Sequence, residues 1–247
     1  MRDLRRILVW IAAVGLFVPR VSSAQPDLWQ KAVQIAARNQ NWVPGEAYTR
    51  TEMMNTKGKL EHIEESELRI LRRQGGEVKT EIVRVVRDGK DETAQARKKQ
   101  QEAEKKNPDK AGGKTFRVGR SPFLPEVQDS VTVQPLDSTA TIDGKRCAGF
   151  RFEELVPRGR KIVGTAWLDV QTGAPVLLEF EPRPLPKRVK KMRTQIRYKW
   201  TPEGDWYPVE MTMSGEGGFL FIKKRFRSVI RLSKHWRAEE ERKGDSN

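Results

Sequence analysis

The chain alternates apolar and polar residues in short, regularly spaced segments, and this period of two constrains its fold more than any other feature. Successive side chains of a β-strand point to opposite faces, so such alternation predicts strands with one buried and one wet face. Turn signals such as Asp143-Gly144, Thr172-Gly173 and Glu203-Gly204 separate the segments. Regularly spaced strands joined by tight turns predict an antiparallel sheet that is strongly curved or closed.

Two groups of strands follow from this pattern. The first group has three predicted strands and the second has seven, over the ranges 46–55, 59–72 and 77–87, then 129–134, 146–156, 162–170, 175–182, 193–201, 205–214 and 218–236. The segment Gly164–Phe180, GTAWLDVQTGAPVLLEF, contains two apolar runs around a turn and predicts a hairpin. Its apolar face covers either a plain core or a cavity for a ligand.

Two helical segments are predicted. Residues 26–39 place Trp29 and Val33 on one face at helical spacing, which is typical of a short amphipathic helix. Residues 91–106 are almost wholly charged or Gln and Ala, and they predict a solvated helix. This second helix belongs to a charged insert near 88–114 that separates the two groups of strands.

The first 24 residues have the features of a secretory signal peptide. Arg2, Arg5 and Arg6 form a positive region, residues 7–18 are apolar, and small residues lead to a cleavage site near Ala24. Export to the periplasm is therefore predicted, with an uncleaved anchor as the alternative. No cysteine stands at the cleavage site, so a lipid-anchored lipoprotein is not expected.

The rest of the chain is expected to form one domain. This domain covers 25–237, and a polar, disordered tail covers 238–247. Cys147 is the only cysteine, so no intrachain disulfide is possible and the fold must rest on its core.

The net charge of the chain is +15, and it falls to +12 once residues 1–24 are removed. Residues 183–193 and 217–237 together carry thirteen basic side chains and no acidic one. A basic face attracts anionic lipid at roughly 1 kcal/mol per Lys or Arg, or it serves only to keep the protein soluble. Nucleic acid is not an expected partner of an exported chain. The residues expected to touch an anionic surface are Lys187, Arg188, Lys190, Lys191, Arg193, Arg197, Lys199, Lys223, Arg225, Arg227 and Arg231.

Catalytic and metal-binding signals are weak. His62 has only Glu64 as a near carboxylate on its own strand face, and a metal site needs more ligands. Cys147 has no identifiable histidine partner, and Gly244-Asp245-Ser246 lacks the strand–turn–helix context of a hydrolase nucleophile. We therefore expect no enzyme, no metal and no cofactor. The remaining alternative to a non-enzymatic protein is an enzyme that acts on acidic envelope glycans.

Apolar residues of the predicted strands, most of them aromatic or methionine, are the candidates for lining a ligand cavity, although an ordinary sheet core is the alternative. These candidates are Trp167, Val176, Leu178, Phe180, Phe150, Phe152, Tyr207, Met211 and Met213. Alternation places Tyr207, Met211 and Met213 on one face.

The segment Gly164–Phe180 resembles the G-x-x-W-[IL]-D-x-x-T-G-x-P hairpin of LolA/RseB-like exported proteins, which include outer-membrane lipoprotein-sorting proteins. Ser121–Val133, Ile142–Glu154 and Gly217–Ser233 resemble segments of bacterial relatives, so the resemblance covers most of 26–237. It implies a mainly β half-barrel, a curved antiparallel sheet wrapped around helices with an apolar cavity between them.

The resemblance also implies a function. In lipoprotein carriers of this type the cavity shelters acyl chains, whereas RseB-like members sense mislocalised envelope components. The leading hypothesis is a non-enzymatic periplasmic carrier that binds a lipid or acylated protein and turns its basic face toward an anionic membrane or partner. The alternative is an RseB-like sensor or scaffold that binds another envelope protein.

Overall fold

The computed structural model describes residues 25–39, 42–72, 78–106, 121–157, 159–219 and 222–237. The predicted signal peptide, the predicted tail and the part of the predicted insert after Lys106 lie outside the described residues. Among the helices that are described, none is both long enough and apolar enough to cross a membrane.

The described elements are α1 (Gln25–Arg38), β1 (Trp42–Val43), β2 (Glu46–Asn55), β3 (Leu60–Arg72), β4 (Val78–Arg87), β5 (Lys90–Asp91), α2 (Thr93–Lys106), the 3₁₀ helix η3 (Pro125–Ser130), β6 (Val131–Ile142), β7 (Lys145–Val156), β8 (Arg160–Asp169), β9 (Pro175–Arg183), β10 (Val189–Trp200), β11 (Trp206–Phe219), β12 (Ile222–Ser233) and β13 (Trp236–Arg237). The predicted helices at 26–39 and 91–106 are thus confirmed to within two residues at each end.

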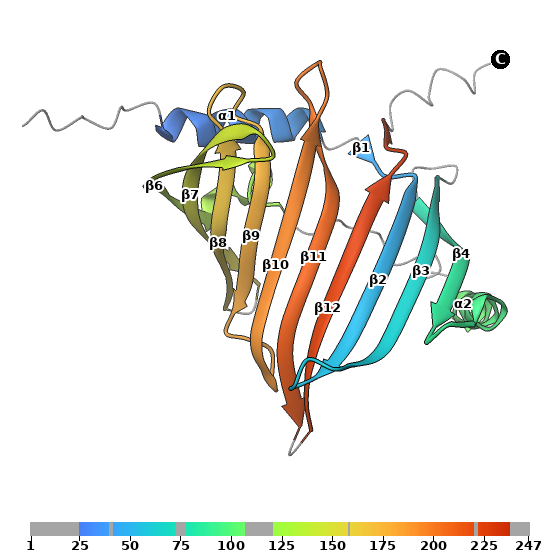
Figure 1. Cartoon of the computed structure of the whole chain (residues 1–247). Helices are drawn as coiled ribbons and strands as arrows, with labels where there is room; N and C mark the ends of the chain where they lie inside the picture. The colour runs from blue at the N-terminus through green and yellow to red at the C-terminus, as the bar shows by residue number, and fades with distance from the viewer. Residues whose placement is uncertain are drawn as a thin grey trace, which may run out of the picture.

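Eleven of the described strands form one antiparallel sheet in the order β5-β4-β3-β2-β12-β11-β10-β9-β8-β7-β6. Neighbours in each group are joined by hairpins, and the pairing of β2 with β12 joins the two groups. The sheet is curved and open, because its end strands β5 and β6 do not pair with each other (Figure 1). The predicted fold class, a mainly β chain whose curved antiparallel sheet wraps around helices, is confirmed.

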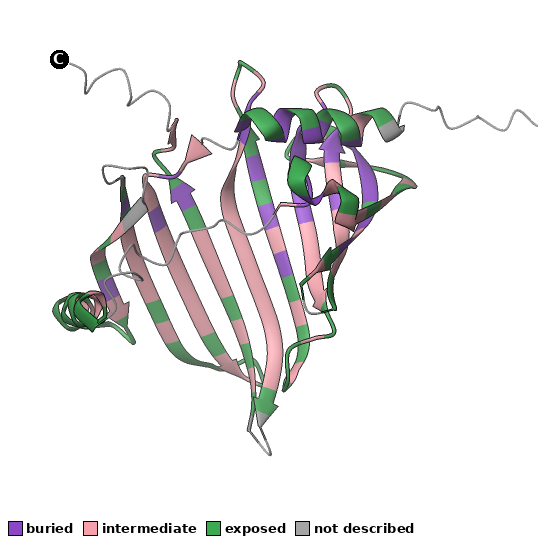
Figure 2. Ribbon diagram, turned by 180° about the vertical axis from the view of Figure 1, so that it is seen from behind, coloured by how far each residue is buried: buried purple, intermediate pink, exposed green. Residues whose placement is uncertain are grey.

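Helix α1 lies across one end of the sheet and packs on β7 to β11 (Figures 1 and 2). Its face at helical spacing is buried, and Trp29 is its largest member. The ring centroid of Trp29 lies 4.8 Å from that of Phe123, which stands just before η3. The Trp29 indole N–H donates a 3.1 Å hydrogen bond to Oε1 of Gln128 in η3. This contact fixes α1 and η3 to each other over the sheet.

The hairpin predicted for Gly164–Phe180 is confirmed as β8 and β9, in which Trp167 pairs with Leu177. The Asp169 carboxylate organises the turn, since it accepts hydrogen bonds from the backbone N–H of Gln171 and the hydroxyl of Thr172, both at 3.0 Å. Gly164 is required in β8, because a Cβ there would lie 2.2 Å from the backbone oxygen of Glu179.

The predicted strand 218–236 is confirmed as β12 over Ile222–Ser233, but its start is wrong, because β11 continues through Gly217 and Gly218 to Phe219. These glycines do not form the turn that their sequence suggested. A Cβ on Gly217 would lie 2.8 Å from the carbonyl oxygen of Arg188, and Gly218 donates a 3.0 Å hydrogen bond to that oxygen. The glycines therefore permit the loop before β10 to approach β11 closely.

The predicted strand 129–134 is displaced. Residues up to Ser130 form η3, and β6 then extends to Ile142. Pro135 lies within β6, where the pairing with β7 becomes irregular. A proline is tolerated there because β6 is an edge strand of the sheet.

Helix α2 lies along the opposite edge of the sheet, beside β4 (Figure 1). The Arg97 guanidinium donates to the carbonyl oxygens of Ile82 and Val83 at 2.9 and 3.0 Å, and the Gln100 amide donates to that of Thr80 at 2.7 Å. None of the α2 residues is buried, as its charged sequence predicted. The helix nevertheless covers a sheet edge, which would otherwise expose unpaired backbone groups.

Replacing Arg97 and Gln100 together by alanine is expected to open this edge. Since the two Arg97 hydrogen bonds are exposed and the Gln100 hydrogen bond is only partly buried, the free energy of unfolding should fall by only about 1 kcal/mol. Deuterium uptake at residues 80–85 should rise well before global unfolding, as measured by hydrogen exchange and mass spectrometry. The control is Lys98→Ala with Gln101→Ala, and equal uptake in both double variants would contradict the role of α2.

Candidate functional site

The sheet has two faces with different character. We call the face on which α1 packs the helix face and the opposite one the outer face. The predicted cavity residues that lie in or against the packed core are Phe150, Phe152, Leu178, Phe180 and Met211. Val176 is buried as well. The ring centroids of Phe150 and Phe152 lie 6.0 and 6.3 Å from that of Trp29, so α1 fills the space over them.

Beyond α1 the helix face is less covered (Figure 2). Phe226 of β12 is directly opposite Met53 of β2, and Met213 of β11 lies next to this pair on the same face. The described residues form two buried clusters, the core around Trp29 and a small one of Ala47, Ile70 and Leu232. Phe226, Met53 and Met213 belong to neither cluster. Phe226 lies flat over Gly215, since a Cβ there would meet its ring at 2.6 Å. Met53 and Phe226 escaped the sequence-based site prediction, because alternation alone does not say which part of a face a helix covers.

Trp167 occupies a different place from the other cavity candidates. Its strand partners are Gly149 and Leu177, whereas Leu178 and Phe180 face the core. A Cβ on Gly149 would lie 2.9 Å from the Trp167 ring, so this ring lies over the glycine on the outer face. Trp167 and Leu178, both predicted to line one cavity, therefore lie on opposite faces of the sheet.

Tyr207 does not share a face with Met211 and Met213 as the alternation suggested. In the pairing of β10 with β11, Arg197 is opposite Glu210 and Tyr198 is opposite Pro208, which leaves Val209 unpaired. This bulge reverses the alternation, so Trp206 and Met211 both pack against the core although they are five residues apart.

Tyr207 belongs to an aromatic corner next to the short strands β1 and β13. Its ring centroid lies 5.1 Å from that of Trp42 and 4.2 Å from that of His235. The His235 Nε2–H donates to the carbonyl oxygen of Pro208 at 3.0 Å. Burial lowers the pKa of His235 below its ordinary 6.5, because desolvation disfavours the charged imidazole.

The free energy of unfolding should depend on pH through His235. Because its folded-state pKa is lowered, the unfolded chain takes up the proton first as the pH falls below 6.5. Stability is therefore fully present above that pH and is lost as the pH falls through the folded-state pKa. Urea unfolding at several pH values should show this loss in the wild type and in His62→Gln. An undiminished loss in His235→Gln would contradict the assignment.

The outer face carries a hollow of about 650 Å³, which we call the outer groove. It lies over β10, β11 and β12, with the loop after β9 at its rim. Its lining residues are Met54, Glu181, Arg183, Leu185, Lys190, Lys191, Met192, Arg193, Ser214, Gly215, Glu216, Arg225, Phe226 and Arg227. Strand register places the side chains of Met192 and Phe226 on the helix face, so these two residues border the groove through their backbone. Five predicted anion-binding residues are thus brought together in it. A second hollow of about 430 Å³ adjoins it and shares Glu181 and Arg193.

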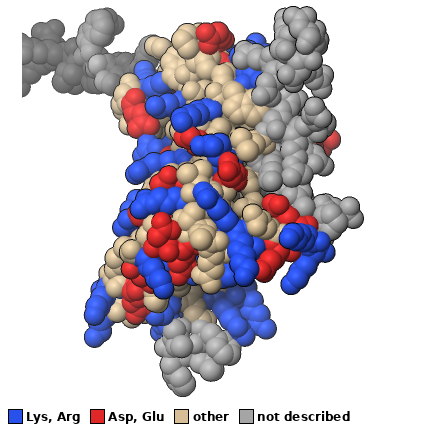
Figure 3. All heavy atoms as spheres, turned by 90° about the vertical axis from the view of Figure 1, so that its right-hand side faces the viewer, with Lys and Arg blue, Asp and Glu red and all other residues tan. Residues whose placement is uncertain are grey.

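The basic face is less positive than the sequence suggested, because neighbouring strands and the turn between β6 and β7 supply carboxylates. The ion pairs are Arg193–Glu179 at 2.6 Å, Arg197–Asp143 at 2.9 Å, Arg225–Glu216 at 3.5 Å and Arg231–Glu210 at 3.4 Å. Acidic and basic side chains are also intermixed on the side where α2 and β4 lie (Figure 3). Exposed pairs of this kind stabilise little but cancel charge.

Several predicted basic residues keep their charge uncompensated. Lys190, Lys191 and Arg227 line the outer groove, and no ion pair joins them to any described residue. Lys187, Lys199 and Lys223 are exposed and also unpaired within the described part of the chain. Lys187 lies in the loop before β10. The uncancelled positive charge is therefore concentrated at the outer groove and the loop beside it.

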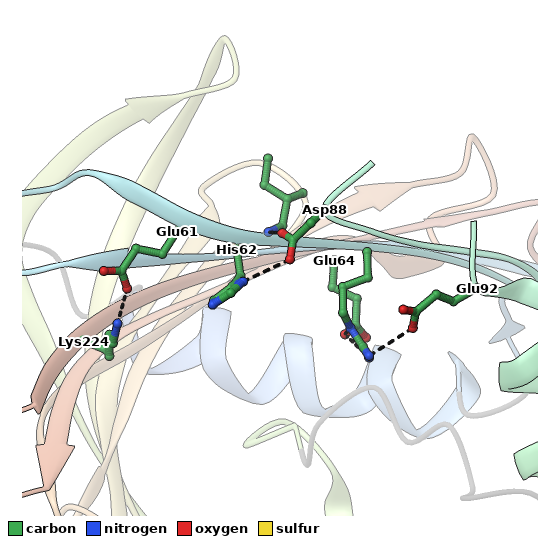
Figure 4. Close-up of polar contacts among 8 residues, drawn as sticks. Glu61, His62, Glu64, Asp88, Glu92 and Lys224 are labelled. Carbon is green, nitrogen blue, oxygen red and sulfur yellow. Dashed lines mark hydrogen bonds and ion pairs between the residues drawn. The ribbon is translucent and has the colours of Figure 1, made fainter. Parts of the chain in front are cut away.

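The His62 region serves to hold a turn (Figure 4). The Asp88 carboxylate lies 3.0 Å from His62 Nδ1 and accepts a 2.8 Å hydrogen bond from the Ile63 backbone N–H. The hydrogen bond from His62 lowers the pKa of Asp88. Next to it, Arg87 pairs with Glu64 at 2.8 Å and Glu92 at 3.0 Å. These contacts fix the β4–β5 turn against β3.

The described residues offer little for catalysis. They contain no group of three or more His, Cys, Asp and Glu side chains placed to hold a metal ion. Burial raises the pKa of the Cys147 thiol, so the thiolate that a nucleophile requires is disfavoured. The same cause raises the pKa of Tyr198.

No protein-family model matches the sequence, and no curated protein sequence is similar to it. Solved structures are similar in fold. An outer membrane lipoprotein-sorting protein domain from Vibrio parahaemolyticus matches at a TM-score of 0.39 and 15% identity, over 85% of this chain and 93% of that one. A LolA superfamily protein from Nitrosomonas europaea matches at 0.36 and 10%, over 85% and 91%.

The Pseudomonas aeruginosa MucA/MucB complex also matches, at a TM-score of 0.23 and 8% identity, over 84% of this chain and 93% of that one. An outer membrane lipoprotein-sorting protein domain and a LolA superfamily protein are thus among the solved structures that the chain resembles in fold. At these identities the likeness concerns the fold and does not extend to a ligand or partner.

Proposed function

We propose that this chain is a non-enzymatic binding protein of the bacterial envelope that holds an acyl chain of a lipid or acylated protein on its helix face. Its outer face then turns toward an anionic membrane or partner. A bacterial periplasm is the proposed location, which follows from the predicted signal peptide.

The observation that supports this proposal is the unequal cover of the helix face. Where α1 packs, the core is filled, but Met213, Phe226 and Met53 lie beyond it and belong to neither buried cluster of the described residues. Met53 is 38% exposed. Methionine and aromatic side chains adapt to irregular apolar ligands, and each buried CH₂ of an acyl chain contributes about 0.8 kcal/mol.

Native mass spectrometry of the protein from a bacterial periplasm, followed by lipid extraction, tests this proposal. We expect a bound mass that organic solvent removes and that fragments as a lipid or acylated peptide. A protein that is empty when purified, and still empty after incubation with envelope lipids, would reject the carrier function.

A partner protein is the second candidate, favoured by Lys187 in the loop before β10 and by the cations of the outer groove that have no ion pair with a described residue. An acidic segment of an envelope protein has the charge to bind there. Reversing Lys187, Lys190 and Lys191 to glutamate should then abolish capture of that partner in a pull-down from the envelope fraction. Unchanged capture would reject this surface.

A further inference from the structure

The outer groove contains a row of three side chains set by strand register. Arg193 of β10 is directly opposite Ser214 of β11, and Ser214 is directly opposite Arg227 of β12. Directly opposite side chains in an antiparallel sheet have Cβ atoms about 4.5–5.5 Å apart. The Ser214 hydroxyl therefore lies between two guanidinium-bearing side chains on one face of the sheet.

The members of this row differ in how they are held. Arg193 is fixed by its 2.6 Å ion pair with Glu179, whereas Arg227 has no ion pair with any described residue. The residue opposite Arg227 on β2 is Glu52, but that carboxylate pairs with Arg50 at 2.9 Å. One arginine is thus preorganised and the other is available to a ligand.

The charge of the groove is strongly unbalanced. Its lining includes six basic residues, Arg183, Lys190, Lys191, Arg193, Arg225 and Arg227, and two acidic ones, Glu181 and Glu216. Both carboxylates are already paired with an arginine of the groove, Arg183 or Arg225. Lys190, Lys191 and Arg227 have no ion pair with any described residue. The groove therefore attracts a ligand with more than one negative charge, or a phosphate group that lies among other negative charges.

The chemistry of the row fits a phosphate group. Guanidinium groups bind phosphate oxygens through paired N–H donors, and a serine hydroxyl adds a donor between them. Met54 and Leu185 give the same groove an apolar part. A free phosphate ion gains nothing from such side chains, whereas the first carbons of a lipid tail do.

We propose that the outer groove binds the phosphate-bearing headgroup of an anionic phospholipid between Arg193, Ser214 and Arg227, with Lys190 and Lys191 at its rim. This inference rests on the part of the proposed function that turns the outer face toward anionic lipid. It is independent of the acyl-chain site, which lies on the opposite face of the sheet. The groove would dock the protein on a membrane while the helix face carries its ligand.

Calorimetric titration with dihexanoyl phosphatidylglycerol below its micelle concentration tests the site directly. We expect binding that weakens about tenfold in Arg227→Gln and about threefold in Ser214→Ala, which corresponds to losses of about 1.4 and 0.6 kcal/mol. The matched control is Lys223→Gln, which removes an unpaired cation of the same strand outside the groove and should change affinity less than twofold. Dihexanoyl phosphatidylcholine should bind at least tenfold more weakly than phosphatidylglycerol.

Three results would overturn the proposal. The first is no binding of phosphatidylglycerol by the wild type, and the second is equal loss in Arg227→Gln and Lys223→Gln. The third is inorganic phosphate or glycerol phosphate binding as tightly as the lipid, which would reject a lipid headgroup as the source. If circular dichroism shows that Arg227→Gln is unfolded, the double variant Lys190→Gln with Lys191→Gln takes its place in the titration. Lipid retained on the helix face, measured by native mass spectrometry of the same samples, reports separately on the proposed function.

Discussion

Trp29→Ala is expected to lower the free energy of unfolding by about 3–5 kcal/mol, the range for removing a large aromatic side chain from a core. Trp29 is 3% exposed and joins α1 to η3 and to the phenylalanines of β7. The substitution also leaves the Gln128 side chain without its 3.1 Å hydrogen bond. The loss of stability is large because the core at this end of the open sheet is closed by α1, and Trp29 is the largest side chain that α1 contributes to it.

Urea unfolding followed by circular dichroism measures this loss. The matched control is Trp200→Ala, because Trp200 is 44% exposed and its main described contact is the Lys145 ammonium, 3.2 Å from the ring centroid. That variant should lose about 1 kcal/mol or less. Similar losses in both tryptophan variants would mean that α1 does not hold the core.

Met213→Asp is expected to reduce acyl-chain binding at least about tenfold, the second large effect. A carboxylate in contact with an acyl chain loses its hydration without gaining a partner, which costs more than 1.4 kcal/mol. The side chain lies on the helix face outside both buried clusters of the described residues. The fold should therefore tolerate the change better than the ligand does.

Thr212→Asp is the control for this substitution. Thr212 precedes Met213 on β11 and pairs with Gln195 and Val229, so the same charge is placed on the outer face. Lipid retention, measured by extraction from equal amounts of folded protein, should fall in Met213→Asp and persist in Thr212→Asp. The reverse order would move the ligand to the outer face.

Much of the fold could be predicted from the sequence, because alternation and turn chemistry are local. The segment Gly164–Phe180 forms the predicted hairpin, and the predicted helix at 26–39 packs through Trp29 as its spacing indicated. Errors arose where a local signal had a non-local cause. Gly217 and Gly218 resemble a turn, but they serve the approach of the loop at Arg188.

The candidate surfaces could be predicted only in part. A single unpaired residue, Val209, moves Tyr207 to a different face from Met211, and no pattern in the sequence announces such a bulge. The basic segments look free of carboxylates, yet Glu179 and Glu216 come from neighbouring strands whose pairing the sequence does not state. Strand order likewise decides that Ser214 lies between Arg193 and Arg227.

The edge cover by α2 illustrates the same limit. Its charged sequence predicts a solvated helix, and the helix is indeed without a buried residue. That Arg97 and Gln100 bind the backbone of β4 follows only once β4 is known to lie next to the end of the sheet.

Photo-cross-linking with a fatty acid that carries a diazirine on its chain tests the central claim most directly. The account predicts that labelled peptides, sequenced by mass spectrometry, carry the label on helix-face residues of β11, β12 and β2, such as Met213, Phe226 and Met53. Unlabelled fatty acid in excess should compete for these sites. Labels confined to the outer face, or scattered without competition, would contradict an acyl-chain site on the helix face.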